Sequence, residues 1–315
     1  MPTLELLEQT MRRVGAALPP EEFVAAVAET YRKVQAVSEA TMDARFRRTR
    51  AYGDFQALLR EAALPAGARV LALGCGPGMA GRSAAFAAAV TREIYPEVKI
   101  EQAAFTPCGG TAAPAGQYDL VVTHSFLHFL LDLAPLGAFL RGALDSGGRY
   151  VMANEPNARF WRNAECLSAL DRVDADEARR NRLRRYTDPS RYAAKLLRSI
   201  RPARRPDPTA GVNGVLRQRF GLRGELTAPE IARICDPYVP HARPGHPTRG
   251  YDGLDWSELE AGPLAGLRVE AVRTSGYVMR DNPDPVPERW RALDGGLAAR
   301  YPLDGCSFSA LWRRA

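Results

Sequence analysis

Apolar residues recur at three- and four-residue spacing through the first 66 residues of the chain. This spacing places apolar side chains on one face of an α-helix and predicts three helices before residue 67. Pro19 and Pro20 separate the first two helices. The positions that carry the pattern are Leu4, Leu7, Met11, Val14 and Leu18, then Phe23, Val27, Tyr31, Val34 and Val37, then Phe55, Leu58, Leu59 and Ala62.

The pattern changes at residue 69. Val70, Leu71 and Leu73 form a short apolar run without helical spacing, and a glycine-rich turn follows before an alanine-rich segment at 79–90. This succession predicts a buried strand, a tight turn and a helix. Glycines in such a turn let a bulky ligand approach the backbone amides, so we expect a nucleotide-like ligand. The turn contains Gly74, Cys75, Gly76 and Gly78.

Further apolar runs predict more strands and leave one irregular gap. Strands are expected near residue 100, at 120–122 and at 150–152, with a helix that Asp132 can cap between the last two. The segment 105–114 is rich in turn residues and leaves little room for the helix and third strand of a full doubly wound sheet. We therefore expect that unit to be abbreviated or missing. Later, Thr227 and Glu230 form a capping box that opens a short helix.

The glycine-rich turn has two interpretations. Gly76, Gly78 and Gly81 spell G-x-G-x-x-G, and Glu101 follows 25 residues after Gly76. This pattern is compatible with a dinucleotide site, in which an acidic side chain binds the ribose. The residues that follow the turn favour the other interpretation.

The continuation of the chain resembles the class I S-adenosylmethionine-dependent methyltransferase family. The matching motifs are the glycine turn, the run Asp-Leu-Val-Val at 119–122 leading to Leu-His at 127–128, and the Gly-Gly pair at 147–148 before the next strand. The resemblance covers roughly residues 68–156 and, more faintly, the C-terminal end, where strands at 267–278 and 307–312 resemble the final antiparallel hairpin. It implies an α/β, Rossmann-like sheet, mostly parallel with an antiparallel last strand, and S-adenosylmethionine as cofactor.

The resemblance also divides the chain into four parts. Residues 1–66 would be a helical N-terminal region that acts as a lid or makes a homodimer, with Phe46, Tyr52 and Phe55 lining the lid. Residues 67–156 would form the core that binds S-adenosylmethionine, and residues 157–225 a basic helical cap inserted after the fifth strand. Residues 226–315 would complete the core sheet.

Candidate site residues follow from the position of ligands in open α/β sheets, beyond the carboxyl ends of the strands. His124 and Ser125 end one expected strand, and Asn154 and Glu155 end the next. By the resemblance, the glycine turn would pass under the methionine and ribose of the cofactor, and His124 and Ser125 would touch its methionine or adenine. Asn154 and Glu155 are catalytic candidates because they are polar groups that close an apolar strand.

Two further roles are open at this stage. Glu101 would hold the ribose hydroxyls, unless the acidic position of the family aligns with Ala104 instead. His124 or His128 would act as a general base, because an imidazole titrates near neutrality. The position of His128 is commonly structural in the family.

One departure from the family pattern suggests another reaction. The family usually has an acidic residue two places before the first glycine, where it helps to bind the α-ammonium of the cofactor, and this chain has Ala72. Without a nearby opposite charge the amine is more easily neutral. The alternative is a cyclase, in which the α-nitrogen attacks its own γ-carbon and releases methylthioadenosine and azetidine-2-carboxylate. Asn154 and Tyr186 would orient the amine.

Charge adds a clue about the substrate. The 315 residues carry a formal charge of +7, and residues 157–223 contain 17 basic and seven acidic residues, a local charge of +10. We expect a methyltransferase of secondary metabolism whose small-molecule acceptor is anionic, a carboxylate or a carrier-protein-bound acid. An RNA-binding or RNA-modifying protein is a more remote alternative, because nucleic-acid binders interleave aromatics with basic residues and only Trp161, Tyr186 and Tyr192 qualify.

The remaining signals are negative. The five cysteines, at 75, 108, 166, 235 and 306, are scattered and never form C-x-x-C, which speaks against a disulfide framework or a zinc site. No apolar run approaches the length of a membrane span, and the first residues lack the regions of a signal peptide. We therefore expect a cytoplasmic protein with reduced thiols, no bound metal and no membrane partner.

Overall fold

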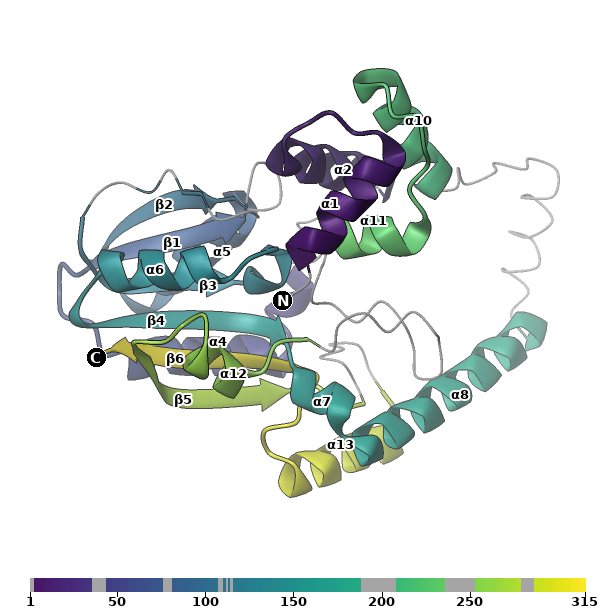
Figure 1. Cartoon of the computed structure of the whole chain (residues 1–315). Helices are drawn as coiled ribbons and strands as arrows, with labels where there is room; N and C mark the ends of the chain where they lie inside the picture. The colour runs from purple at the N-terminus through teal and green to yellow at the C-terminus, as the bar shows by residue number, and fades with distance from the viewer. Residues whose placement is uncertain are drawn as a thin grey trace.

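The computed structural model describes residues 3–35, 44–75, 81–106, 110–111, 113, 116–187, 208–235, 253–278 and 286–315. Six strands form one mixed sheet with the order β2-β1-β3-β4-β6-β5 (Figure 1). Their bounds are β1 Arg69–Cys75, β2 Lys99–Phe105, β3 Tyr118–His124, β4 Leu144–Pro156, β5 Leu267–Ser275 and β6 Ser307–Arg314. Strands β1 to β4 are parallel, and β6 runs antiparallel to both β4 and β5. The expected parallel sheet with a final antiparallel hairpin is confirmed.

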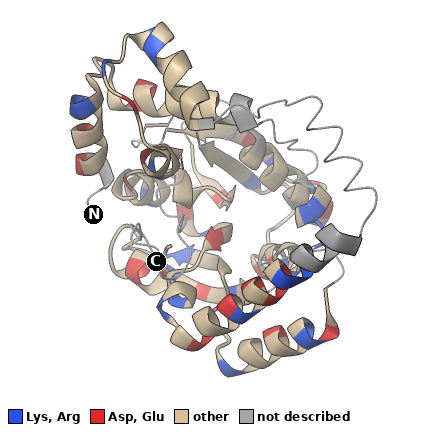
Figure 2. Ribbon diagram, turned by 90° about the vertical axis from the view of Figure 1, so that its right-hand side faces the viewer, with Lys and Arg blue, Asp and Glu red and all other residues tan. Residues whose placement is uncertain are grey.

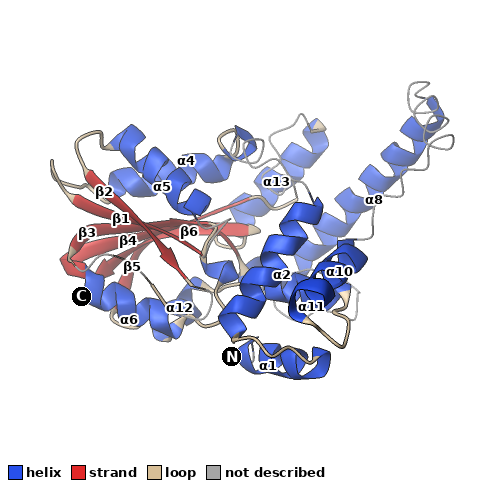
Figure 3. Cartoon of the chain, turned by 90° about the horizontal axis from the view of Figure 1, so that it is seen from above, coloured by secondary structure: helices blue, strands red, loops and turns tan. Residues whose placement is uncertain are grey.

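Both faces of the sheet are covered by helices, which explains why its strands are continuous apolar runs. Val70 and Ala72 lie in one apolar cluster with α4 (Arg50–Glu61) and α5 (Gly81–Ile94). Leu71 and Leu73 point to the opposite face, into a cluster with α6 (Ala134–Ala143) and α12 (Trp256–Ala261). Figure 3 shows the sheet between these two helical layers. Alternate residues of one strand thus stabilise both layers.

The strand at 150–152 is longer than the sequence predicts. It begins at Leu144, so the Gly-Gly pair at 147–148, expected before the strand, lies inside β4. Leu144 pairs with Tyr118, and the register then shifts before Leu120 pairs with Arg149. Gly147 takes a positive φ of 76° at this irregularity, a conformation that favours glycine. A bulge, rather than a turn, therefore explains the two glycines.

The third strand of a full doubly wound sheet is absent from the residues that the structure describes between β2 and β3. The only pairing recorded there is an isolated bridge between Phe105 and Thr111. In the described part of the chain the sheet therefore ends at β2. The expectation of an abbreviated unit is confirmed to that extent.

Four helices from distant parts of the chain form a separate apolar cluster beside the carboxyl end of the sheet (Figure 1). They are α1 (Thr3–Val14), α2 (Pro20–Gln35), α10 (Pro208–Phe220) and α11 (Ala228–Cys235). Leu131, which follows the short helix η2 (Leu127–Phe129), joins this cluster. The capping box of α11 is confirmed, because the Thr227 amide donates to Glu230 at 2.8 Å and the Glu230 amide donates to the Thr227 hydroxyl at 3.4 Å.

A second helical group follows β4. It contains α7 (Ala158–Arg162), α8 (Ala164–Thr187) and α13 (Glu288–Arg300), and α8 and α13 share an apolar cluster that includes Leu170 and Leu297. None of the helices in the described ranges is long and apolar enough to cross a bilayer.

Candidate active site

The centre of the sheet contains a switch point at the carboxyl ends of β1 and β3. From β1, the chain continues through α5 to β2 on one side, whereas β3 lies on the other side. Ligands in open α/β sheets bind outside such a point, because the connections leave in opposite directions there. Gly74 and Cys75 end β1 opposite Ala104 and Phe105. Gly76 and Gly78 lie outside the described residues.

Ser125 and Asn154 meet just beyond this edge. The amide of Asn154 donates from Nδ2 to the Ser125 hydroxyl at 2.8 Å, and the Ser125 amide donates to the Ala153 carbonyl at 2.8 Å. Both residues have left-handed backbones, with φ of 46° and 59°. Such conformations cost free energy in residues other than glycine and concentrate at functional sites. The structure thus brings together two of the residues that the sequence selects.

His124, the last residue of β3, is enclosed by aromatic rings. Its ring centroid lies 4.5 Å from that of Phe46, 4.7 Å from that of Phe86 and 6.0 Å from that of Phe55. Burial, followed by the proximity of His128, lowers the pKa of His124 from 6.5 to about 3. The imidazole is therefore neutral near pH 7 and a poor match for a general base at that pH.

The Nε2 atom of His124 is buried and has no hydrogen-bond partner in the described part of the chain. A buried polar atom without a partner is costly, and in native structures such atoms demand an explanation. This side chain is only 8% exposed and lies at the switch point, where a ligand is expected. The orphaned nitrogen therefore fits a site that a ligand completes.

Glu155 is fully buried, and contacts with the chain occupy its carboxylate. Oε1 accepts from the amides of Phe126 and Leu127 at 2.7 and 2.9 Å. Oε2 accepts from the His128 amide at 3.2 Å and lies 2.8 Å from His128 Nδ1. These contacts anchor the first turn of η2, where backbone amides lack helical partners. The geometry gives Glu155 and His128 a positioning role beside the site.

Glu101 lies at the wrong edge of the sheet to bind a ribose at the switch point. It is the third residue of β2 and pairs with Leu71, whereas Phe105 at the other end of β2 pairs with Cys75. Four residue steps along the strand, roughly 13 Å, separate Glu101 from Phe105. Its carboxylate instead accepts from Arg69 at 2.9 Å and from the Tyr118 hydroxyl at 3.0 Å. Strand register instead puts Ala104, the other position that the sequence leaves open, next to the carboxyl end of β2.

The environment of Ala72 is apolar. The residue is completely buried and belongs to the cluster that packs β1 against α4 and α5. Its neighbours across the strands are Gln102 and Val122. A carboxylate at this position would be desolvated among hydrocarbon groups.

The described arginines of segment 157–225 are largely paired with carboxylates. Arg159 lies 3.2 Å from Asp255, and Arg162 lies 2.7 Å from Glu258. Similar pairs join Arg180 to Asp176, Arg217 to Glu225 and Arg219 to Glu29. Figure 2 shows basic and acidic residues interspersed along the helices. These ion pairs offset the charge of five arginines in the described part of the segment. Tyr186 lies in the last turn of α8, and its side chain is outside the described residues.

Sequence reasoning missed two residues of this region. Phe86 is the one aromatic residue in the alanine-rich segment after the glycine turn, and this contrast was the available signal. The hydroxyl of Ser309 accepts a hydrogen bond from the backbone amide of Asn154 at 3.0 Å. It lies on β6, so only the pairing of distant strands brings it there. The described residues contain no cluster of side chains suited to a metal ion.

No family model and no curated protein matches the chain. Several solved structures are similar to it, and two of them serve as examples. One, an S-adenosylmethionine dependent methyltransferase from Mesorhizobium loti, is 14% identical, with 81% of this chain and 95% of that chain covered and a TM-score of 0.29. The other, the YcgJ protein from Bacillus subtilis, is 11% identical, with 83% and 97% covered and a TM-score of 0.31. Similarity this low carries no argument about function.

The order and direction of the strands define the fold class of the chain. The sheet has the parallel central part and the antiparallel last strand that the resemblance implies, with one edge strand fewer in the described part of the chain. The chain therefore has a Rossmann-like α/β fold, with a mostly parallel sheet that ends in an antiparallel hairpin.

Proposed function

We propose that this chain is an S-adenosylmethionine-dependent enzyme that acts on a small molecule, with methyl transfer as its reaction. The observation that carries the proposal is the buried Nε2 of His124, which has no hydrogen-bond partner among the residues that the structure describes and lies at the switch point of a methyltransferase-like sheet. Gly74, at which the glycine-rich segment begins, lies on the neighbouring strand β1. S-adenosylmethionine would supply a methyl group that is already activated by its sulfonium.

In this proposal the protein accelerates the reaction by holding the cofactor and the acceptor in the correct relative position. Backbone amides of the glycine turn would hold the cofactor, and the Ser125 and Asn154 side chains would orient polar groups at the reacting centre. Their left-handed backbones and their mutual hydrogen bond fix both side chains before a ligand arrives. Preorganised orientation is the main source of rate when the leaving group needs no activation.

The low pKa of His124, about 3, bears on the choice of acceptor. A base that weak does not remove a proton efficiently at neutral pH. We therefore favour an acceptor that is already an anion, a small carboxylic acid or a carrier-protein-bound acid of secondary metabolism. A cytoplasmic location, a homodimer and an N-terminal lid remain predictions that accompany this proposal.

A second candidate is the cyclase, which the apolar burial of Ala72 favours. The carboxylate of Glu155 is engaged with η2, and that of Glu101 lies at the other edge, so neither supports a charged ammonium at the switch point. In this reaction the lone pair of the α-nitrogen forms a bond to the γ-carbon. The carbon–sulfur bond breaks, methylthioadenosine leaves with the electron pair, and the nitrogen loses a proton to solvent. Asn154 and Tyr186 would orient the neutral amine.

Incubation of the purified chain with S-adenosylmethionine alone, followed by mass spectrometry, separates the two candidates. Methylthioadenosine together with azetidine-2-carboxylate would establish the cyclase. An unchanged cofactor that binds in calorimetry supports the methyltransferase, and a panel of small carboxylic acids then identifies the acceptor by a mass gain of one methyl group. Failure of S-adenosylmethionine to bind would refute both reactions. The Asn154→Gly variant lacks a side chain that is proposed to orient the ligand, and it serves as the negative control for binding and turnover.

A further inference from the structure

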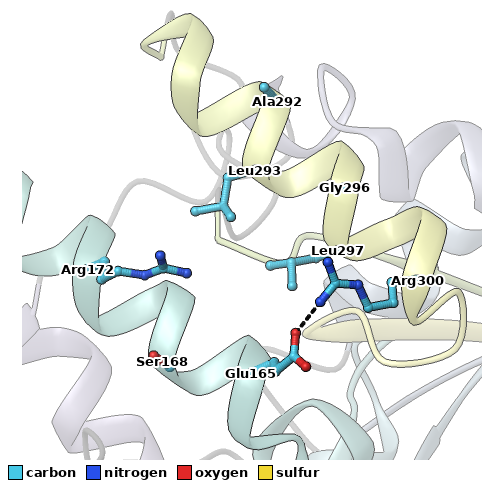
Figure 4. A pocket seen from close by; sticks show the side chains of 8 residues that line it. All are labelled: Glu165, Ser168, Arg172, Ala292, Leu293, Gly296, Leu297 and Arg300. Atoms are coloured by element: carbon cyan, nitrogen blue, oxygen red, sulfur yellow. Dashed lines mark hydrogen bonds and ion pairs between the residues drawn. The ribbon is translucent and has the colours of Figure 1, made fainter.

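Two helices outside the candidate active site face each other across a groove. On α13, Leu293, Gly296 and Leu297 are spaced by three and four residues and share one helix face. On α8, Ser168 and Arg172 are four residues apart and also share a face. These residues line a cavity of about 250 Å³ between the helices (Figure 4). The chain therefore contains a concave site that the proposed reaction does not use.

The floor of the groove is apolar. Leu297 is buried, and Leu293 packs against the cluster that joins α8 to α13. Leu170 and Val173 of α8 belong to the same cluster. A ligand with a hydrocarbon body would thus remove apolar surface from water when it lies on this floor.

Three charged side chains line the groove, and one of them, Arg172, is available to bind a ligand. Glu165 and Arg300 form an ion pair at one end. Arg172 has neither a hydrogen bond nor an ion pair with any other residue in the described ranges, and its guanidinium extends into the groove on the side of Leu293 (Figure 4). The groove therefore has a net positive charge beside an apolar floor.

Gly296 provides the open space. A Cβ added there would meet no atom within 4 Å, so no packing contact requires a glycine. Glycine in a helix interior also lowers helix stability relative to alanine. Its neighbour Gly295 is equally open but does not line the groove. The two positions form a natural pair of test and control.

We propose that the groove between α8 and α13 binds a small organic monocarboxylate. A guanidinium binds a carboxylate through two parallel hydrogen bonds, and the hydroxyl of Ser168 can donate a third. The hydrocarbon part would lie on Leu293 and Leu297. The Glu165 carboxylate at the end of the groove disfavours ligands with more negative charge. The cavity corresponds to about eight water molecules at ~30 Å³ each, which suits a chain such as octanoate.

Isothermal titration calorimetry of the full chain with octanoate tests the proposal directly and needs no S-adenosylmethionine. We expect one site per chain. Arg172→Gln should weaken binding about tenfold or more, because the bidentate charged contact is lost. Uncharged octanol should bind more weakly than octanoate by a similar factor.

Gly296→Leu should abolish binding, because the new side chain occupies the groove, and leucine is a better helix former than glycine, so α13 should remain folded. Gly295→Leu should bind octanoate within about twofold of the unchanged chain, because it places the same side chain outside the groove. Circular dichroism confirms that all variants fold. The proposal is overturned when octanoate fails to bind, or when Arg172→Gln and Gly296→Leu bind it as tightly as the unchanged chain.

Discussion

The side-chain amide of Asn154 donates a hydrogen bond of 2.8 Å to the hydroxyl of Ser125, and both residues have left-handed backbones. Ser125 follows β3 directly and Asn154 lies in the neighbouring parallel strand β4, where His124 pairs with Ala153 immediately before them. A left-handed conformation costs roughly 1–2 kcal/mol for a residue with a Cβ, although asparagine tolerates it better than most. Two neighbouring residues at the carboxyl edge of the sheet therefore both adopt an unfavourable backbone conformation. We therefore expect these residues to matter more for ligand binding than for stability.

Substitution of Asn154 separates its effect on ligand binding from its effect on the stability of the fold. Asn154→Gly keeps the backbone conformation and removes the side chain, so the free energy of unfolding should fall by only about 0.5–1.5 kcal/mol for the lost hydrogen bond. Affinity for S-adenosylmethionine, or turnover of it, should fall tenfold or more. Asn154→Ala should lose about 1 kcal/mol more stability, because alanine is strained at this φ. Urea denaturation and calorimetry measure both quantities. Wild-type affinity in Asn154→Gly would contradict the proposed site.

Glu155→Gln should destabilise the protein. The carboxylate accepts from three backbone amides and contacts His128, whereas a glutamine has only one acceptor oxygen. Each buried amide left without an acceptor costs about 1–3 kcal/mol. Glu288→Gln is the control, because that side chain is 85% exposed, and its change should stay within about 0.5 kcal/mol. Equal unfolding midpoints for the two variants would contradict the anchoring role.

His124 should remain uncharged throughout the neutral pH range. Its folded-state pKa is about 3 and its ordinary pKa is 6.5, so the unfolded chain binds the extra proton first. Its contribution to stability is complete above pH 6.5 and is lost as the pH falls toward 3, by about 1.4 kcal/mol per pH unit. Nuclear magnetic resonance of the imidazole, assigned with a His124→Gln variant, should show no titration between pH 5 and 8. A midpoint near 6.5 would show that the ring is exposed.

Glu101→Gln should leave affinity for S-adenosylmethionine unchanged within about twofold. The carboxylate lies at the amino end of the sheet, where it binds Arg69 and Tyr118, far from the ends of β1 and β3. The same calorimetric titration as for Asn154→Gly makes the comparison direct. A tenfold loss of affinity in Glu101→Gln would place the ligand at the opposite edge and refute the switch-point site.

Local patterns predicted most of the sheet. The apolar run before Gly74 and the run at 120–122 became β1 and β3, and the last 49 residues contain the expected hairpin of β5 and β6. These runs could be recognised because strands buried on both faces are continuously apolar. The full length of β4 could not, because the pairing of Leu144 with Tyr118 joins residues distant in the chain.

The sequence predicted which residues lie at the candidate site, but it did not predict their arrangement in space. Sequence alone placed Ser125 and Asn154 at the ends of strands, because each follows an apolar run. It also placed Glu101 on a strand, yet strand register decided at which edge its carboxylate lies.

The sequence by itself thus determined the order of elements, the glycine turn and the polar residues that close the strands, since these depend on neighbours along the chain. Tertiary structure alone decided that His124 lies among Phe46, Phe55 and Phe86, that Glu155 anchors η2, and that α8 and α13 enclose a groove. These features depend on burial and on contacts between distant segments, which no local pattern encodes.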